Sequence, residues 1–275
     1  MSVINTNVSA MYSQNAMKTN SRAMSTAMEQ LSTGTRVNSA KDDAAGLAIG
    51  QNLSSQIRGL NMAVRNLNDG INMMQTAEGA MVEQSNMLQR MRELAVQAMN
   101  GTYDVDQRAY LDAEFQELKE QIGKIATDTT WNDQVLLDGS VGEFVFQAGP
   151  SQDQSITVTI ENMGLGSGST IEIVSASIVD VDTATAALGS IENSLQAINT
   201  QRATIGAGIN RMEYAADNLT NVSSNATQSR STIMDTDYAL ATTQLAKAQI
   251  IQQAATAMLA QANQQPQQVM QLLKG

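Results

Sequence analysis

The chain has 275 residues and a formal net charge of −11, with 16 basic against 27 acidic residues, so it lacks the basic face that a nucleic-acid-binding protein presents. It contains no Cys and no His, which excludes disulfides, thiolate and imidazole metal sites, and nucleophile systems that need an imidazole base. Aromatic residues make up 3% and Met numbers 17, a composition that suits contacts between long helices better than a thick globular interior.

The N-terminal segment, residues 1–31, has few apolar side chains for a helix of its length. Because their burial cannot offset the conformational entropy of ordering the segment, such a helix is not stable alone. Residues 1–20 carry one Lys and no continuous apolar run, so we expect no ordinary cleaved signal peptide. No stretch of the chain approaches the roughly 18 apolar residues that span a bilayer, so we expect no membrane insertion.

Residues 44–99 predict one long helix. Apolar side chains recur every seven residues along it, at Leu60, Leu67, Met74, Met81, Leu88 and Ala95. Asp42 or Asp43 is the expected N-cap, and Gly101 is a natural stop. At about 1.5 Å per residue, such a helix is on the order of 80 Å long.

The middle of the chain predicts a shorter helix followed by a β-hairpin. From about 106 to 127, apolar residues alternate at spacings of four and three: Leu111, Phe115, Leu118, Ile122 and Ile125. The period then changes, because β-branched and aromatic residues dominate 143–147 and 155–160, with a Gly-Pro turn at 149–153 between them. We expect a further short strand at Ile171 and Ile173.

The C-terminal half carries the most regular repeat. From Leu188 to Leu219 apolar residues keep a three-four alternation that only Arg202 interrupts, and such a stripe needs an apolar partner. The helices at 44–99 and 106–127 are the expected partners. We therefore predict a mainly α fold, a long antiparallel helical coiled-coil bundle with a small β-hairpin region in the middle of the chain. Its expected rod core is Leu60, Leu67, Ile71, Leu88, Leu111, Phe115, Leu195, Ile198, Ile205 and Ile209.

The C-terminal segment, residues 233–275, is rich in Ala and Gln. Its main apolar anchors are Leu240, Leu245, Ile250, Ile251, Met258 and Leu259. Like residues 1–31, it is too sparsely apolar to be stable as an isolated helix. We expect both ends to be disordered in the monomer and to become helical when many copies pack together.

Several runs of sequence carry a family resemblance. The chain has Val-Ile-Asn-Thr-Asn at 3–7, Leu-Ser-Thr-Gly-Thr-Arg-Val-Asn-Ser-Ala-Lys-Asp-Asp-Ala-Ala-Gly at 31–46 and Leu-Gln-Arg-Met-Arg-Glu-Leu-Ala-Val-Gln at 88–97. Near its end stand Asp-Thr-Asp-Tyr-Ala at 235–239 and Ala-Gln-Ala-Asn-Gln-Gln-Pro-Gln-Gln-Val at 260–269. In content and order these runs resemble the signatures of the bacterial flagellins, and they span nearly the whole chain.

The resemblance implies a structural subunit that self-assembles into the flagellar filament used for motility. It implies that residues 1–43 and 229–275 form an inner tube, and that 44–228 form a helical rod with a β-rich segment at about 131–175. The chain is a minimal form, because only about 50 residues separate Trp131 from Val181 and the variable outer domains of longer flagellins are absent. The expected inner-tube packing residues are Ile4, Val8, Met11, Ile251, Met258 and Leu259.

The resemblance also implies type III export and a secreted, extracellular filament. The expected partners are further copies of the chain, an export chaperone, the filament cap and the hook-junction proteins, and no cofactor is expected. The chain departs from the family at Trp131-Asn132-Asp133, where Phe-Asn-Gly is usual, and so lacks the Gly that supplies a turn of positive φ.

Two groups of residues are candidates for a functional site. By resemblance, Arg90 and Leu94 match the pattern that a Toll-like receptor of animal hosts recognises, and Glu114 matches the acidic partner position. The alternative is that Arg90 and Glu114 are simply exposed or subunit-bridging residues on helical faces. Asp42 and Asp43 resemble a catalytic carboxylate pair, but adjacent acids at a helix start more often cap free N–H groups.

Other functional classes stay open beside the filament subunit. A hook-filament junction protein of the same apparatus shares flagellin-like ends. A monomeric coiled-coil binding module or secretion chaperone would stay a small oligomer that never elongates. An enzymatic flagellin would need a His-Glu-x-x-His helix, and the chain has no His. The glycine run at 164–168 is a poor phosphate loop, because neither a Lys nor a long helix follows it.

Overall fold

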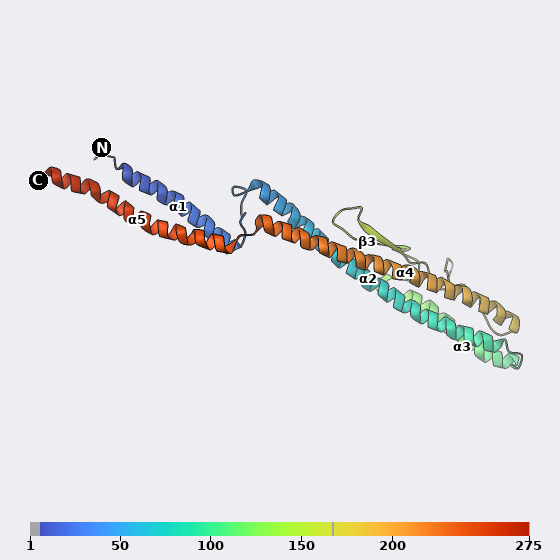
Figure 1. Cartoon of the computed structure of the whole chain (residues 1–275). Helices are drawn as coiled ribbons and strands as arrows, with labels where there is room; N and C mark the ends of the chain where they lie inside the picture. The colour runs from blue at the N-terminus through green and yellow to red at the C-terminus, as the bar shows by residue number, and fades with distance from the viewer. Residues whose placement is uncertain (1–5, 167, 275) are drawn as a thin grey trace. The chain divides into compact units, whose positions relative to one another are not determined.

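The computed structural model describes residues 6–166 and 168–274, and of residues 265–274 the backbone alone. The predicted fold class is confirmed, because the described chain is mainly helical with two small antiparallel strand pairs (Figure 1). Contacts divide the chain into a terminal unit, Met1–Ile57 with Ser224–Gly275, and a central unit, Arg58–Ser223. Helices α2 (Ala44–Ala98) and α4 (Val181–Met234) contribute residues to both units.

The first two helices, α1 and α2, begin at side chains that accept hydrogen bonds from free helix N–H groups. Helix α1 (Val8–Thr33) starts at Asn7, whose Oδ1 accepts from Ala10 N at 3.0 Å. It ends at Gly34, which takes the left-handed conformation with φ 72°. Helix α2 starts at Asp43, whose Oδ1 accepts from Gly46 N at 2.8 Å, so Asp43 and not Asp42 is its N-cap.

Helix α3 (Val105–Asp128) starts with a capping box. The Asp104 carboxylate caps the first turn, and the Gln107 side chain accepts from Asp104 N at 3.2 Å. Arg108 Nε donates to Ala98 O at 2.9 Å, so α3 binds a carbonyl at the C-terminal end of α2. The predicted ranges for α2 and α3 agree with the observed bounds to within a residue at each end.

The core of the central unit lies between α2, α3, α4 and the β-hairpin. Several methionines are among its largest fully buried side chains. The full set is Phe115, Leu67, Met74, Met81, Leu88, Met91, Leu94, Ile122, Leu136, Leu137, Ile160 and Met163. Gln84 is also buried, and its Nε2 donates to Ile122 O at 3.2 Å and to Met163 O at 3.1 Å. This amide thus ties α2 to α3 and to the segment that follows the hairpin.

The predicted rod-core residues fall into two groups. The structure buries Leu60, Leu67, Ile71, Leu88, Phe115, Ile198 and Ile205. It places Leu111, Leu195 and Ile209 half-buried at the edge of the core, packed against it without being enclosed.

The edge position of Leu195 and Ile209 has a clear cause on α4. The hairpin and the loop after it pack against the other side of the helix, so smaller or polar residues are enclosed there. Gln201 Nε2 donates to Thr159 O at 2.8 Å, and Ser194 Oγ accepts from Glu172 N at 3.0 Å. A Cβ added at Gly208 would lie 2.8 Å from Val158 Cγ2. The buried face of α4 is therefore rotated from the one that the apolar repeat predicts.

Strands β3 (Glu143–Gln147) and β4 (Ser155–Thr159) form the predicted hairpin. Phe144 pairs with Val158, and both pack into the core, whereas Val145 is 62% exposed on the opposite face. The further strand expected at Ile171 and Ile173 is wrong. Both side chains are buried, but the segment is irregular, because the Glu172 N–H between them donates to a helix side chain instead of a strand.

Strands β1 (Thr130–Trp131) and β2 (Gln134–Val135) pair across a two-residue turn. Asn132 has φ 48° and Asp133 has φ 63°, so both turn residues are left-handed. The turn of positive φ therefore persists without the family's Gly, because Asn and Asp tolerate this conformation better than other side-chain-bearing residues.

We predict that Asp133→Gly stabilises the central unit by about 0.5–1 kcal/mol, because glycine adopts φ 63° without steric cost. Urea unfolding followed by circular dichroism measures the change. Gln134→Gly is the matched control: it places the same residue in β2 and should destabilise the unit. A midpoint that falls in Asp133→Gly as well would contradict the prediction.

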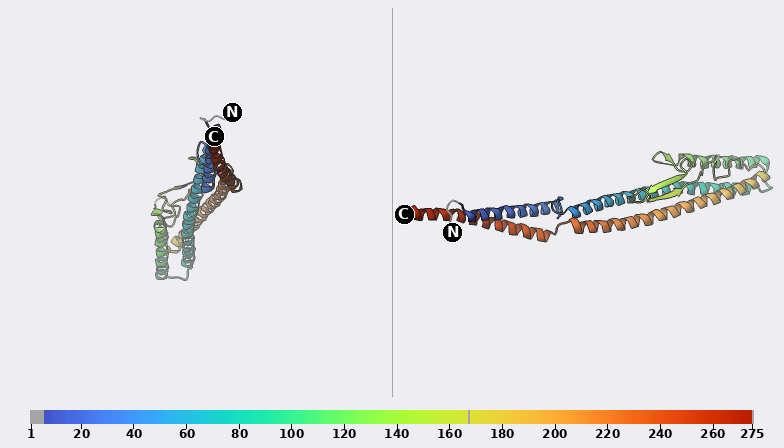
Figure 2. Two further views of the ribbon diagram at one scale, coloured as in Figure 1. Left: turned by 90° about the vertical axis from the view of Figure 1, so that its left-hand side faces the viewer. Right: turned by 90° about the horizontal axis from the view of Figure 1, so that it is seen from above.

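The terminal unit pairs α1 with α5 (Tyr238–Lys274), and both views of Figure 2 show them side by side. Asp237 caps α5, since its Oδ1 accepts from Ala239 N at 2.9 Å and Leu240 N at 3.2 Å. The described parts of both terminal segments are thus helical here, and the disorder expected of the free monomer stays a prediction.

Candidate functional site

The seam between α1 and α5 is built from small side chains. Alanines are buried on both helices: Ala10, Ala27, Ala241, Ala248 and Ala262. Small side chains let two helix backbones approach closely, but they bury little apolar area. The seam therefore buries few of the large apolar side chains of α1 and α5.

The N-cap of α1, Asn7, and Asn20 within the helix fix the register of this seam. Asn7 Nδ2 donates to Ala262 O and Asn20 Nδ2 donates to Ala248 O, both at 2.7 Å. Since the acceptor number falls as the donor number rises, the two helices are antiparallel. The sequence reasoning missed both residues. In the sequence, the signal that could have identified them is an Asn on the same helical face as the buried alanines.

A second set of contacts joins the two connecting segments of the terminal unit. Thr35 and Asp235 form an isolated antiparallel bridge, and Arg36 N donates to Met234 O at 2.6 Å. The Arg36 guanidinium donates to Ile233 O at 2.7 Å, a carbonyl at the C-terminal end of α4. A cation at this position is stabilised by the helix macrodipole. We call residues 34–36 with 233–236 the linker bridge.

Large apolar side chains of α1 and α5 face outward from the seam. Their exposed fractions are high, reaching 66% for Ile250 and 75% for Tyr12. We call the set the terminal apolar surface: Val8, Met11, Tyr12, Met28, Leu240, Ile250, Ile251 and Met258. A groove of about 530 Å³ runs beside it, lined mainly by α1 residues and by Ile251 of α5. Exposed apolar surface of this extent marks a binding face.

Four of the predicted inner-tube residues belong to this surface: Val8, Met11, Ile251 and Met258. Leu259 is half-buried on α5. Ile4 lies outside the described residues.

The residues expected to meet a host receptor do not share one environment. Arg90 on α2 contacts Glu114 on α3 at 2.9 Å and Glu93 at 3.0 Å, and these side chains are about half exposed or more. The hydrogen bond to Glu114, and then that to Glu93, raise the pKa of Arg90 above its ordinary value. Leu94 is only 1% exposed and packs in the core, and its part in receptor recognition stays a prediction.

The two acidic residues at the start of α2 have separate structural partners. Asp43 caps the helix, whereas Asp42 Oδ2 accepts from Ser39 N at 3.0 Å and from Ser39 Oγ at 2.7 Å. Within the described residues, no three or more His, Cys, Asp or Glu side chains gather as a metal site would require. The arrangement supports capping of backbone groups.

We predict that Ser39→Ala raises the pKa of Asp42, because the Ser39 side-chain hydrogen bond is the main cause that holds this pKa below its ordinary 3.8. Because the pKa of Asp42 is lower in the folded chain than in the unfolded chain, its ionised form stabilises the folded loop at pH values above the unfolded pKa. This stabilisation is lost as the pH falls through the folded pKa. Carboxyl NMR titration of the two proteins measures the shift. An Asp42 pKa that is unchanged by Ser39→Ala would show that the hydrogen bond is not its cause.

The glycine-rich segment is a loop with local hydrogen bonds. Gly164 N donates to Asn162 Oδ1 at 2.9 Å, and Ser169 N donates to Gly166 O at 3.2 Å. Its donors therefore serve the turn itself.

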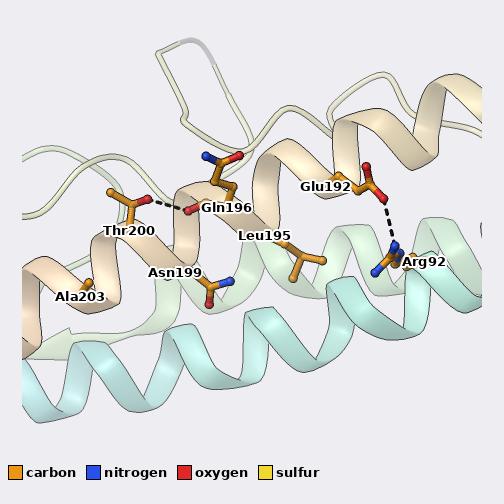
Figure 3. A pocket seen from close by; sticks show the side chains of 7 residues that line it. All are labelled: Arg92, Glu192, Leu195, Gln196, Asn199, Thr200 and Ala203. Carbon is orange, nitrogen blue, oxygen red and sulfur yellow. Dashed lines mark hydrogen bonds and ion pairs between the residues drawn. The ribbon is translucent and has the colours of Figure 1, made fainter.

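A groove of about 630 Å³ lies on the central unit between α2 and α4 (Figure 3). Arg92 of α2 faces Glu192 of α4 across it at 3.0 Å, and Leu195 points into the space between the two helices. Thr200 Oγ1 is directed back to Gln196 O of its own helix at 2.9 Å. Both side chains of this ion pair are about half exposed, so the pair contributes little to stability. We interpret the groove as a surface feature between two packed helices.

None of the helices described is both long and apolar enough to cross a lipid bilayer.

Comparison with known proteins places these features in a family. Residues 4–141 match the bacterial flagellin N-terminal helical region, and residues 188–273 match the bacterial flagellin C-terminal helical region. The chain is 43% identical over 272 residues to a flagellin of Halalkalibacterium halodurans, a match that covers 99% of this chain and 100% of that protein.

Solved structures agree with this assignment. The crystal structure of Bacillus cereus flagellin matches with a TM-score of 0.50 and 31% identity, over 56% of this chain and 88% of that one. A putative flagellar hook-associated protein from Vibrio parahaemolyticus matches with a TM-score of 0.59 over 70% of this chain and 99% of that one, but at 13% identity it shows a shared fold alone. Because flagellin signatures match both halves and the identity extends over the whole length, the chain belongs to the bacterial flagellin family and is a structural subunit of the flagellar filament.

Proposed function

We propose that the terminal unit supplies the contacts that hold neighbouring subunits together at the centre of the filament. The observation that carries this proposal is the terminal apolar surface, since eight large side chains stay exposed on a pair of helices joined through alanines. Fully burying one such side chain stabilises an assembly by about 1.5–3 kcal/mol. Contacts with other copies are the means by which a homopolymer covers this surface. Ile4 and Leu259 are proposed to extend it.

The proposed inner-tube domain is residues 1–43 with 229–275, and the proposed rod domain is 44–228 with its β-rich segment at about 131–175. The division of contacts after Ile57 and after Ser223 supports two such layers. The fully buried core of α2, α3, α4 and the hairpin supports a rod layer that folds independently of assembly.

The proposed location is the extracellular filament, reached by type III export that reads an uncleaved signal. The proposed partners besides further copies are an export chaperone, the filament cap and the hook-junction proteins. A chaperone role is supported by the same exposed side chains, because a free subunit presents apolar surface before it assembles. The proposed role is structural and not enzymatic.

Recognition by a host Toll-like receptor is proposed through Arg90 and Glu114. Their support is partial exposure on neighbouring helices and a shared ion pair that presents charge at a fixed position. Leu94, which is buried in the core, is the third residue that the resemblance assigns to this recognition. Receptor-expressing cells exposed to purified monomer test the proposal: no activation where another flagellin activates would refute it.

Seeded polymerisation tests the main proposal. Purified full-length protein is mixed with sheared filaments at high salt and examined by negative-stain electron microscopy. We expect long uniform filaments. Persistent monomers or short assemblies under seeding would refute the inner-tube proposal.

A further inference from the structure

The methionines of the central core and those of the terminal apolar surface differ sharply in exposure. In the central unit the sulfur-bearing side chains of the core are fully buried: Met74, Met81, Met91, Met163 and Met212. On α1 and α5, Met11 is 55% exposed, Met28 is 48% exposed and Met258 is 62% exposed. The thioether is the most readily oxidised group in a chain that has no Cys. Of the four methionines that are exposed among the described side chains, three therefore lie on the terminal apolar surface and the fourth, Met62, lies in the central unit.

The register of the seam places two of these sulfurs together along the pair. Asn7 of α1 binds the carbonyl of Ala262 of α5, and the helices are antiparallel. Met11 follows Asn7 by four residues and Met258 precedes Ala262 by four, so both lie one helical turn inward at the same level. Met28 lies next to the buried Ala27 near the other end of the pair. Oxidation at these positions would alter both ends of the contact surface.

We propose that Met11, Met28 and Met258 form a redox-sensitive modification site through which hydroperoxides block assembly of the free subunit. In the reaction, the thioether sulfur attacks the OH oxygen of the hydroperoxide, the O–O bond breaks, and the proton of that oxygen passes to the departing oxygen. A sulfoxide and an alcohol form, or a sulfoxide and water where the oxidant is hydrogen peroxide. The sulfur is oxidised by two electrons and the peroxide is reduced by two. The proposal rests on the proposed function, because it requires that these side chains are buried between copies in the filament.

The consequence follows from the polarity of the product. A sulfoxide is polar and chiral, and it replaces a flexible apolar group that the contact needs. Once covered by neighbouring copies, the same sulfurs are shielded from solvent. The oxidant thus inactivates free subunits and spares finished filaments, while the buried sulfurs of the central unit leave that unit folded.

Mass spectrometry and seeded polymerisation test the site together. Monomer and preformed filament are treated with hydrogen peroxide, quenched, digested and scored for sulfoxide at each methionine. In monomer we expect the three terminal positions to be oxidised at least about tenfold faster than the buried central ones, and in filament we expect this preference to disappear. Oxidised monomer should elongate seeds at least about tenfold more slowly, and methionine sulfoxide reductase should restore elongation. Equal oxidation rates at the buried central methionines and the three terminal ones, or normal elongation by oxidised monomer, would overturn the proposal.

Variants separate this inference from the proposed function. The triple variant Met11→Leu, Met28→Leu, Met258→Leu is compared with its own untreated sample, and peroxide should leave its elongation nearly unchanged.

Met62→Gln is the matched control for Met28→Gln, because both residues are 48% exposed and Met62 lies in the central unit. We expect Gln, a polar mimic of the sulfoxide, to slow elongation at position 28 and not at position 62. An equal loss at both would overturn the assignment to the terminal helices. Failure of the untreated wild type to elongate would refute the proposed function instead, and the sulfoxide pattern would still decide the modification site.

Discussion

Deletion of residues 233–275 should leave a folded central unit that no longer elongates into filaments. The deletion removes α5, half of the terminal apolar surface and the acceptors of Asn7 and Asn20, but it retains the whole of the central unit. We expect elongation of seeds to fall by about 100-fold or more, since a loss of only about 2.7 kcal/mol per contact lowers an association constant that far. Seeded polymerisation followed by electron microscopy measures this loss.

Deletion of residues 1–31 is the matched experiment from the other end. It removes most of α1, and by the same reasoning it should also abolish elongation. Circular dichroism and thermal unfolding check that both truncated chains keep the helical transition of the central unit. If either truncated chain formed normal filaments, contacts outside the terminal helices would have to be sufficient for assembly.

Phe115→Ala should destabilise the central unit by about 3–5 kcal/mol, the largest effect that we expect from a single substitution. Phe115 is fully buried on α3 among the side chains of the core, and its truncation leaves a cavity. For a unit of this size the melting temperature should fall by about 6–20 °C. Scanning calorimetry or thermal circular dichroism measures the shift.

Tyr110→Ala on the same helix is the control for Phe115→Ala, because Tyr110 is 78% exposed. It should change the melting temperature by no more than a degree or two, since surface substitutions usually alter stability by less than about 0.5 kcal/mol. Similar losses in the two variants would mean that aromatic content, and not burial, sets the stability of α3.

Helix positions were largely predictable from the sequence because apolar spacing determines them locally. The seven-residue repeat of α2 and the four-three spacing of α3 predicted both ranges to within a residue at each end. The hairpin was predictable for the same reason, since alternation and a Gly-Pro turn stand next to each other in the chain. Where the spacing of apolar residues is regular and the contacts are local, the sequence pattern alone predicts the position of the element.

The faces of the helices were less predictable because they depend on what packs against them. The repeat on α4 favours Leu195 and Ile209, yet the docked hairpin encloses Gln201 and Gly208 on the other side. No apolar signal marks a Gln that binds a strand carbonyl. Leu94 was selected by resemblance to a receptor-recognition pattern, and only the packing shows that it is buried.

The candidate site was predicted in part. Val8, Met11, Ile251 and Met258 were chosen as packing residues, and their exposure on the isolated pair makes them available for contacts between copies. Asn7 and Asn20 were missed, since a polar residue that recognises a backbone carbonyl depends on a partner more than 200 residues away.

The linker bridge and the asparagine contacts have a consequence for synthesis of the chain. The partner that Asn7 binds lies 255 residues further on. At about 5–20 residues per second, the ribosome needs about 13–50 s to reach it, and α1 has no intramolecular partner during that time. A chain that terminates early never acquires α5, so its first helix stays unpaired. The pairing of the two ends therefore requires a chain that has been synthesised through α5.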